Sequence, residues 1–219
     1  MNQVSCCVFD LETTNLSADF GVVLCGVVKP AHGRPRVFRA DRLNRHWHSQ
    51  RSDDSAVVAA IVEELEQYDI WVAHNGQRFD VPFLRTRLLA HGTEPLPAKK
   101  LIDPVLLARN KLRMSFNSLE QVANHLGVNS KTSVEPRQWL AAALDGSKKA
   151  MGYIVDHCVQ DVLVLEKVIG ALKAYSGTYN TYGSGFRSLT GRCRNTKAAP
   201  SNTPAAMKLT RIWTAGNTT

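Results

Sequence analysis

The sequence predicts an α/β fold in which a mixed, five-stranded sheet is flanked by helices. Residues 4–10 and 21–29 are rich in apolar and β-branched side chains and are separated by a turn-rich stretch, which predicts a hairpin. Residues 36–40 add a third strand. Short apolar runs at 70–73 and 101–102 then alternate with segments of helical periodicity. Three strands followed by alternating helices and strands are typical of a mixed sheet with helices on its faces.

Helices in the first half of the chain are identified from apolar spacing and from capping residues. In residues 53–68 apolar side chains recur every four positions, and Asp53 or Asp54 is expected to cap this helix. Residues 81–91 are expected to form a second helix, which Gly92 closes.

The second half of the chain is predicted to be mostly helical. Ser118 and Gln121 form a capping-box pair at the start of a helix that stops at Gly127. Pro136 is expected just before a helix over 137–144, since proline is tolerated in a first turn. The longest predicted helix covers about residues 148–174. Its expected core stripe consists of Ile154, Val155, Cys158, Val162, Leu165 and Ile169.

Positive charge is concentrated near the C-terminus. The chain has 27 basic and 19 acidic residues and a formal net charge of +8. Residues 176–219 contain no acidic side chain and are rich in Gly, Ser, Thr, Asn and Pro, so we expect a domain of residues 1–175 followed by a basic extension. A surplus of Lys and Arg favours nucleic acid as partner. Ile212 and Trp213 could instead dock a protein partner.

Composition also narrows the cellular setting. The five cysteines are odd in number and form no C-x-x-C pair, which argues against a disulfide framework or a zinc finger and favours buried, reduced thiols. No apolar run approaches the roughly 18 residues that cross a bilayer. The first strand-like run begins by Val4, before a signal peptide could fit. We therefore expect a cytoplasmic protein with no membrane partner.

Asp10 and Glu12 stand at the end of the first predicted strand. Side chains two positions apart on a strand share a face, so the two carboxylates project together. Carboxylates about 4 Å apart repel by roughly 4 kcal/mol at an effective dielectric of about 20, which favours a bound cation. The alternative interpretation is a D-x-E sequence that only ends a strand at the surface.

Two further segments carry acidic residues. Asp80 falls where a strand runs into a helix, beside an Asn-Gly turn signal. A simple helix-capping role is the alternative for Asp80. His157 and Asp161 are four positions apart and share one face of the long helix. A surface His–Asp pair is the alternative there.

Together, these segments resemble the three exonuclease motifs of the DEDD (DnaQ-like) superfamily. In order along the chain they are D-x-E, then N-x-x-x-F-D-x-x-x-L, then a final acid in a C-terminal helix. The second motif is formed by Asn75, Phe79, Asp80 and Leu84. The resemblance is closest to the proofreading domain of family B DNA polymerases and their stand-alone relatives, and it covers about residues 4–174. It implies a ribonuclease H-like fold.

The resemblance also implies a metal-dependent 3'→5' exonuclease that acts on nucleic acid, with single-stranded DNA favoured. Four carboxylates would hold two divalent ions, Mg²⁺ or Mn²⁺. The implied metal ligands are Asp10, Glu12, Asp80 and Asp161. The residues implied to bind the terminal nucleotide are Thr13, Thr14 and Asn75, with Phe79 supporting the site.

The last motif departs from both branches of this superfamily. One branch has Tyr-x3-Asp and the other His-x4-Asp, whereas this chain has His157-x3-Asp161. We expect His157 to occupy the tyrosine position as general base or water orienter, because imidazole has a reference pKa near 6.5 and accepts a proton at neutral pH. Tyr153, one turn earlier, is the rival.

Several other residues are weaker candidates. His46 and His48 flank Trp47 on an expected strand, where surface or packing roles are favoured over a metal site. His74 is expected to be structural. The basic residues that could meet substrate phosphates, or else lie in solvated loops, are Arg109, Lys111 and Arg113, in the connection before Asn117, and Lys131.

Two other functions are compatible with the same fold. One is a non-catalytic scaffold that binds nucleic acid, although a decayed enzyme usually lacks an acidic ligand and all four are present here. The other is a structure-selective endonuclease, which would cut circular single-stranded DNA.

Overall fold

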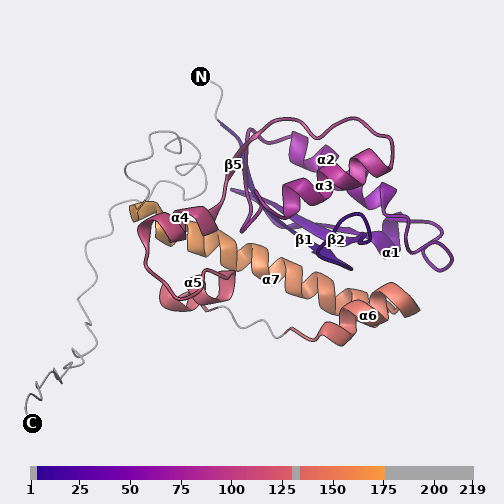
Figure 1. The fold of residues 1–219 in the computed structure, drawn as a ribbon. Helices are drawn as coiled ribbons and strands as arrows, with labels where there is room; N and C mark the ends of the chain where they lie inside the picture. Colours follow the sequence, from indigo (N-terminus) through magenta and orange to yellow (C-terminus); the bar gives the residue numbers. More distant parts are fainter. Residues whose placement is uncertain (1–3, 130–133, 176–219) are drawn as a thin grey trace, which may run out of the picture.

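One mixed sheet organises the computed structural model, which describes residues 4–129 and 134–175 (Figure 1). Its strands are β1 (Cys6–Thr13), β2 (Val23–Pro30), β3 (Arg36–Arg39), β4 (Ile70–Val72) and β5 (Lys100–Ile102). The spatial order is β3-β2-β1-β4-β5. β1, β2 and β3 pair antiparallel, whereas β4 pairs parallel with both β1 and β5. The five predicted strands and the mixed sheet are therefore confirmed.

Helices cover both faces of this sheet (Figure 1). They are α1 (Ala40–Leu43), α2 (Ser55–Glu66), α3 (Asp80–Ala90), α4 (Pro104–Lys111), α5 (Leu119–His125), α6 (Pro136–Asp145) and α7 (Lys148–Leu172), followed by a 3-10 turn at Lys173–Tyr175. α2 and α3 lie on one face, and α7 crosses the other against β1 and β2. α4, α5 and α6 pack on α7. None of the described helices is both long and apolar enough to cross a membrane.

The two faces of β1 differ in chemistry. Leu11 faces α2. Gly26 of the paired strand β2 lets Ile61 of α2 approach the sheet closely, because a Cβ on Gly26 would lie 2.5 Å from Ile61 Cδ1 and 3.0 Å from Leu11 Cδ2. Asp10 faces α7, because the Cys158 thiol of that helix contacts its carboxylate. The predicted apolar stripe of α7 is buried along its whole length. α7 thus seals the sheet face that carries the acidic pair.

The predicted helix caps are confirmed in part. The Ser118 hydroxyl accepts the backbone N–H of Gln121 at 3.3 Å, as the capping-box pattern predicts. At α2 the Asp53 carboxylate accepts the N–H of Ser55 at 3.0 Å. Asp54 occupies the N-cap position itself, but its side chain makes no capping hydrogen bond and turns to partners on other elements.

Two local expectations are wrong. Residues 46–48 lie in a turn after α1 rather than on a strand, and Trp47 is buried there. Arg109 and Lys111 belong to α4 rather than to an irregular connection. The Asp103 carboxylate caps this helix by accepting the N–H of Val105, and Pro104 is its first residue.

Buried free thiols are confirmed for four cysteines within the described ranges, Cys6, Cys7, Cys25 and Cys158. Cys193, Lys131, and the predicted extension over 176–219 with Ile212 and Trp213 lie outside the described residues.

Candidate active site

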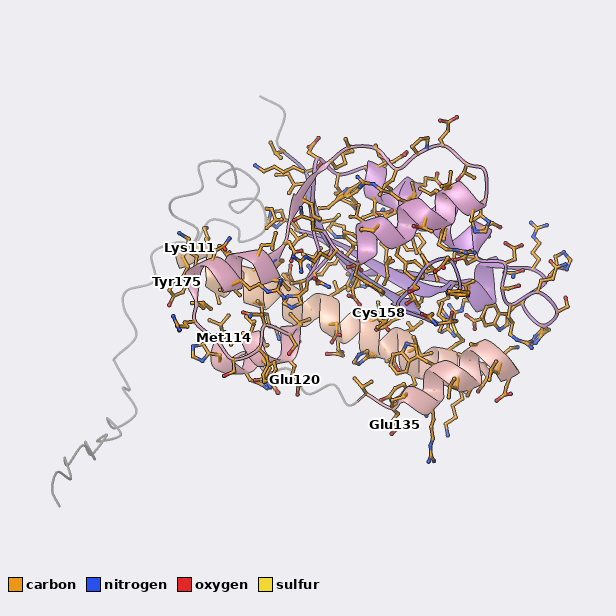
Figure 2. All side chains as sticks on the ribbon, viewed as in Figure 1. Lys111, Met114, Glu120, Glu135, Cys158 and Tyr175 are labelled. Atoms are coloured by element: carbon orange, nitrogen blue, oxygen red, sulfur yellow. The ribbon has the colours of Figure 1, made fainter. Side chains whose placement is uncertain are left out.

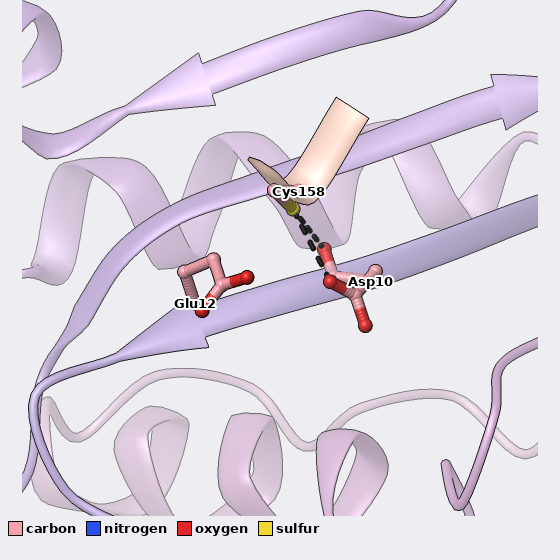
Figure 3. Close-up of side chains that lie close together, drawn as sticks. All are labelled: Asp10, Glu12 and Cys158. Atoms are coloured by element: carbon pink, nitrogen blue, oxygen red, sulfur yellow. Dashed lines mark hydrogen bonds between the residues drawn. The ribbon is translucent and has the colours of Figure 1, made fainter. Parts of the chain in front are cut away.

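Asp10 and Glu12 project from the C-terminal end of β1 toward α7 (Figure 3). Both lie on the same face, as their i, i+2 spacing predicts. The pairing of β1 with β2 shifts register between Glu12 and Thr13. Such bulges are common beside active sites, where they bend the strand and re-aim side chains. The acidic pair therefore stands where the regular strand ends.

Asp80 is the first residue of α3 and is almost completely buried, with 2% of its surface exposed. Its carboxylate lies close enough to Asp10 for its charge to raise the pKa of Asp10. Its Oδ1 atom is buried and has no hydrogen-bond partner. A buried carboxylate oxygen without a donor is costly unless a cation satisfies it.

His157 and Asp161 reach the same point from α7. His157 Nε2 lies 3.9 Å from Glu12 Oε1 and 3.5 Å from Asp161 Oδ2. Ligand atoms of Glu12, His157 and Asp161 all lie within 4.8 Å of one another, as do those of Asp10, Glu12 and Cys158. The structure thus brings together the five residues that the sequence predicts to be catalytic, which belong to three distant segments of the chain. They are Asp10, Glu12, Asp80, His157 and Asp161.

The electrostatics of this cluster fit a divalent cation. Burial raises the pKa of Glu12 to about 8 and the pKa of Asp80 to about 7. Burial also raises the pKa of Asp10 well above its usual value, and the charges of Asp80, Glu12 and Asp161 raise it further. Carboxylates that repel each other in this way are stabilised as anions by a bound cation. Hard oxygen ligands suit Mg²⁺ or Mn²⁺.

The residues implied to bind the terminal nucleotide lie in the chain segments that adjoin Glu12 and Asp80. Thr13 and Thr14 follow the bulge, and their hydroxyls contact the β1–β2 turn: Thr13 Oγ1 donates to the Asn15 carbonyl, and Thr14 Oγ1 accepts the Val22 N–H. These contacts order the turn itself.

Asn75 and Phe79 lie in the segment between β4 and α3. Asn75 has a φ of 64°, the only positive φ among described non-glycine residues, and its backbone N–H donates to Asp103. A left-handed asparagine is uncommon, and such strain often accompanies functional sites. Phe79 packs on Phe83, with 5.6 Å between the ring centroids.

Trp139 of α6 is a site residue that the sequence motifs miss. Its indole Nε1 donates to Glu12 Oε2 at 3.1 Å, which opposes the rise in the pKa of Glu12. Its ring also packs edge-on against His157, at 5.6 Å between centroids, and against Tyr153, at 6.2 Å. Trp139 therefore fixes both an acidic side chain and the histidine beside it.

Cys158 is a second site residue that the sequence motifs miss. The predicted stripe of α7 includes it only as a core residue. It lies in the middle of α7, where the helix crosses the sheet (Figure 2). Its Sγ contacts both Asp10 Oδ2, at 3.4 Å, and the Asp10 carbonyl, at 3.5 Å. Sulfur thus borders the candidate metal ligands directly.

The other candidates lie outside the cluster. His74 Nε2 contacts the carbonyl oxygen of Asn117 at 2.9 Å, in agreement with a structural role. His46 and His48 belong to neither of the metal-capable groups found among the described residues. Arg109 lies near enough to His74 to lower its pKa, after the larger effect of burial.

The chain matches a known protein family. A family model for the RNase H superfamily matches residues 7–173. The chain belongs to the RNase H superfamily. This membership, together with the mixed sheet, establishes an RNase H-like fold and supports a nuclease-type function. No curated protein matches the sequence.

Solved structures similar to this RNase H superfamily chain include the family B DNA polymerase from the hyperthermophilic archaeon Pyrobaculum calidifontis. The TM-score is 0.59 at 18% sequence identity, and the match covers 87% of this chain and 27% of the polymerase. The chain therefore spans about a quarter of the length of that protein. A likeness at this level of identity shows the shared fold.

Without divalent metal, the protein is expected to lose stability as the pH rises from about 5 to about 8.5. Raised carboxyl pKa values, about 8 for Glu12 and about 7 for Asp80, mean that the folded state binds more protons than the unfolded state over this range. The stability that these two groups contribute is therefore fully present below the ordinary carboxyl pKa and is lost as the pH passes the folded values. In EDTA we expect a fall in Tm of at least about 3 °C.

Thermal unfolding at several pH values checks this prediction. The matched variant Glu12→Gln removes one of the raised groups and should show a smaller fall. Added Mg²⁺ should restore the Tm at pH 8, because a ligand of the folded state stabilises it. A Tm in EDTA that rises over the same range would contradict the raised carboxyl pKa values.

Replacing Trp139 with Phe is expected to weaken metal-dependent turnover about 10-fold to 100-fold, the usual effect of losing an outer hydrogen bond to a metal ligand. Phenylalanine keeps an aromatic ring beside His157 but cannot donate to Glu12. The measurement is the Mg²⁺ dependence of the nuclease rate. Trp47→Phe, at a buried tryptophan in the turn after α1, is the matched control. Equal rates and equal Mg²⁺ dependence for Trp139→Phe would show that the hydrogen bond has no functional role.

Proposed function

We propose that this chain is a metal-dependent 3'→5' exonuclease of the DEDD type, which releases nucleotides from the 3' end of nucleic acid, with single-stranded DNA favoured. The observation that carries the proposal is the convergence of Asp10, Glu12 and Asp161 with His157 within the distances given above, with Asp80 near enough for its charge to act on Asp10. Membership in the RNase H superfamily supports a nuclease. The order of the three motifs supports the narrower assignment.

Each carboxylate has a proposed place in the site. Asp10, Glu12 and Asp161 would hold one divalent ion, and Asp10 and Asp80 would hold a second. Bound divalent ions lower the pKa of the attacking water and neutralise charge on the attacking and leaving oxygens of an in-line displacement. Asp80 supports this assignment because its buried Oδ1 has no other partner.

The chain's own residues would position the reacting groups. His157 would accept a proton from water or orient it, since its Nε2 lies among the acidic groups. Tyr153, the rival for this role, packs against Trp139 one turn away. Asn75 and Phe79, beside Asp80, would hold the terminal nucleotide together with Thr13 and Thr14 after β1.

Replacing His157 with Ala is expected to lower turnover by about 10²-fold to 10⁴-fold, the usual contribution of a positioned proton-transfer group. Turnover at saturating Mg²⁺ measures the effect. Tyr153→Phe is the matched control and should keep the wild-type turnover. A His157→Ala protein with near-normal turnover would exclude this role.

A time course on 5'-labelled single-stranded DNA and RNA oligonucleotides, with Mg²⁺ or Mn²⁺, tests the proposed function. The expected result is a ladder that shortens from the 3' end and that requires metal. Absence of cleavage with either ion would refute the proposal and favour a non-catalytic scaffold that binds nucleic acid. Cleavage of circular single-stranded DNA would identify an endonuclease instead.

The same substrates test the proposed domain boundary. We place the exonuclease domain in residues 1–175 and a nucleic-acid-binding role in the basic residues 176–219. A protein that ends at Tyr175 should then bind more weakly and with less salt dependence, because it releases fewer counterions. Unchanged binding would refute that role and leave Ile212 and Trp213 as candidates for contact with a protein partner.

A further inference from the structure

The Cys158 thiol is placed like a ligand rather than like an ordinary core side chain. Its Sγ lies 3.4 Å from Asp10 Oδ2, and Figure 3 shows it facing the strand between Asp10 and Glu12. The sulfur and one oxygen from each carboxylate all lie within 4.8 Å of one another. Cys158 itself is completely buried.

These separations match a sulfur–oxygen metal site. A tetrahedral zinc ion has Zn–S distances of about 2.3 Å and Zn–O distances of about 2.0 Å, which place its sulfur and oxygen ligands about 3.5 Å apart. The observed Sγ–Oδ2 distance of 3.4 Å agrees with this value. One ion could therefore contact both atoms with little movement of either side chain.

A second observation points to a bound cation at the same place. Asp80 has only 2% of its surface exposed, and its Oδ1 has no hydrogen-bond partner. It belongs to the same group of charges as Asp10. A carboxylate oxygen without a partner therefore belongs to a residue whose charge acts on Asp10, one of the proposed ligands.

We propose that Asp10, Glu12 and Cys158 form a site for a thiophilic divalent cation such as Zn²⁺, Co²⁺ or Cd²⁺, overlapping the Mg²⁺ or Mn²⁺ site. On binding, the Cys158 S–H bond breaks, the sulfur pair forms a bond to the ion, and the proton passes to solvent with no change of oxidation state. Because the ion takes Asp10 and Glu12, it inhibits the nuclease. That inhibition rests on the proposed function, whereas the binding does not.

The two classes of ion would use different ligands of the same cluster, because only thiophilic ions bind the sulfur. Mg²⁺ takes oxygen ligands in near-octahedral geometry and does not use a thiolate, whereas Zn²⁺ and Co²⁺ bind thiolates well. Replacing Cys158 with Ser, whose hydroxyl can still donate to Asp10, should therefore weaken binding of Zn²⁺ and leave binding of Mg²⁺ nearly unchanged. Loss of Asp10 should weaken both.

The test is optical and uses the full chain without nucleic acid. Cys193→Ser serves as the starting protein, so that the remaining thiols are the four buried ones. Titration with Co²⁺ should give a sulfur-to-cobalt charge-transfer band, and competition with a chromogenic chelator should give the Zn²⁺ affinity. In Cys158→Ser the band should disappear, and the Zn²⁺ affinity should fall by at least about 10-fold. Mg²⁺ affinity should change by less than about twofold.

Cys6→Ser is the matched control, because Cys6 is a buried thiol on the same strand as Asp10. It should keep both the band and the Zn²⁺ affinity. If Cys158→Ser does not fold, Cys158→Ala and the starting protein itself still decide the matter. Absence of a charge-transfer band in the starting protein, or its persistence without Cys158, would overturn the inference.

The two proposals fail separately. A protein that shows the band but degrades no nucleic acid keeps the metal site and refutes the exonuclease. An active exonuclease without the band refutes the thiophilic site alone.

Discussion

Asp10→Asn is expected to reduce nuclease turnover by at least about 1,000-fold while the fold stays intact. The amide is nearly isosteric, but it lacks the charge that would serve both proposed ions, and metal stabilisation of the transition state is worth several kcal/mol, or about three orders of magnitude in rate. Metal-free stability should be unchanged or higher, because the substitution removes a carboxyl group whose pKa is raised by burial and by three neighbouring acids.

Two measurements on one preparation check this prediction. The shortening of a 5'-labelled oligonucleotide gives the rate, and thermal unfolding in EDTA gives the stability. Glu63→Gln, an exposed acid on α2 across the sheet, is the matched control and should keep the wild-type rate. A loss of rate that comes with a lower Tm would indicate damage to the fold rather than loss of a metal ligand.

Asp54→Ala should produce the largest loss of stability, about 3–5 kcal/mol in the free energy of unfolding. The Asp54 carboxylate is 1% exposed and accepts from Arg87 Nη2 at 2.8 Å and from the Val23 N–H at 2.8 Å, and His91 Nε2 lies 2.6 Å away. Removing it leaves the buried Arg87 guanidinium without its carboxylate partner, with only the Ala18 carbonyl as acceptor among the described residues. The same change also leaves a buried N–H of β2 without its acceptor.

Urea-induced unfolding measures this cost, and the Tm should fall by roughly 6–20 °C. Asp53→Ala is the matched control one residue earlier. It removes the acceptor of the Ser55 N–H and should cost only about 1 kcal/mol. A cost below about 1 kcal/mol for Asp54→Ala would show that the cluster around Asp54 makes no net contribution to stability.

The strands and the long helix could be predicted because their signals are local. Short runs of apolar and β-branched side chains predict the strands, and the periodic stripe on α7 predicts its buried face. α4 was missed although the sequence contained its signal: Asp103 followed by Pro104 is an N-cap and first-turn pair. His46 and His48 lie in a turn rather than on a strand, because the Asn44 side chain accepts the His46 N–H and donates to the carbonyls of Gln50 and Asp53.

The candidate site was predictable where motif spacing defines it and not where partners come from elsewhere. Asp10 and Glu12 are paired by strand geometry, and His157 and Asp161 by one helical turn. Trp139 has no such relation to Glu12, since α6 and β1 meet only in the folded protein. The predicted stripe placed Cys158 in the core, but its contact with Asp10 depends on how α7 crosses β1.

Asp10 and Asp161 belong to the first strand and the last long helix of the described chain. On the ribosome, β1 emerges well before the segment that forms α7. A nascent chain therefore cannot assemble the acidic cluster until α7 has been synthesised. Contacts between such distant segments also slow folding, because a long loop must close before they form. Nuclease activity at this cluster would thus require that β1 and α7 have already packed together.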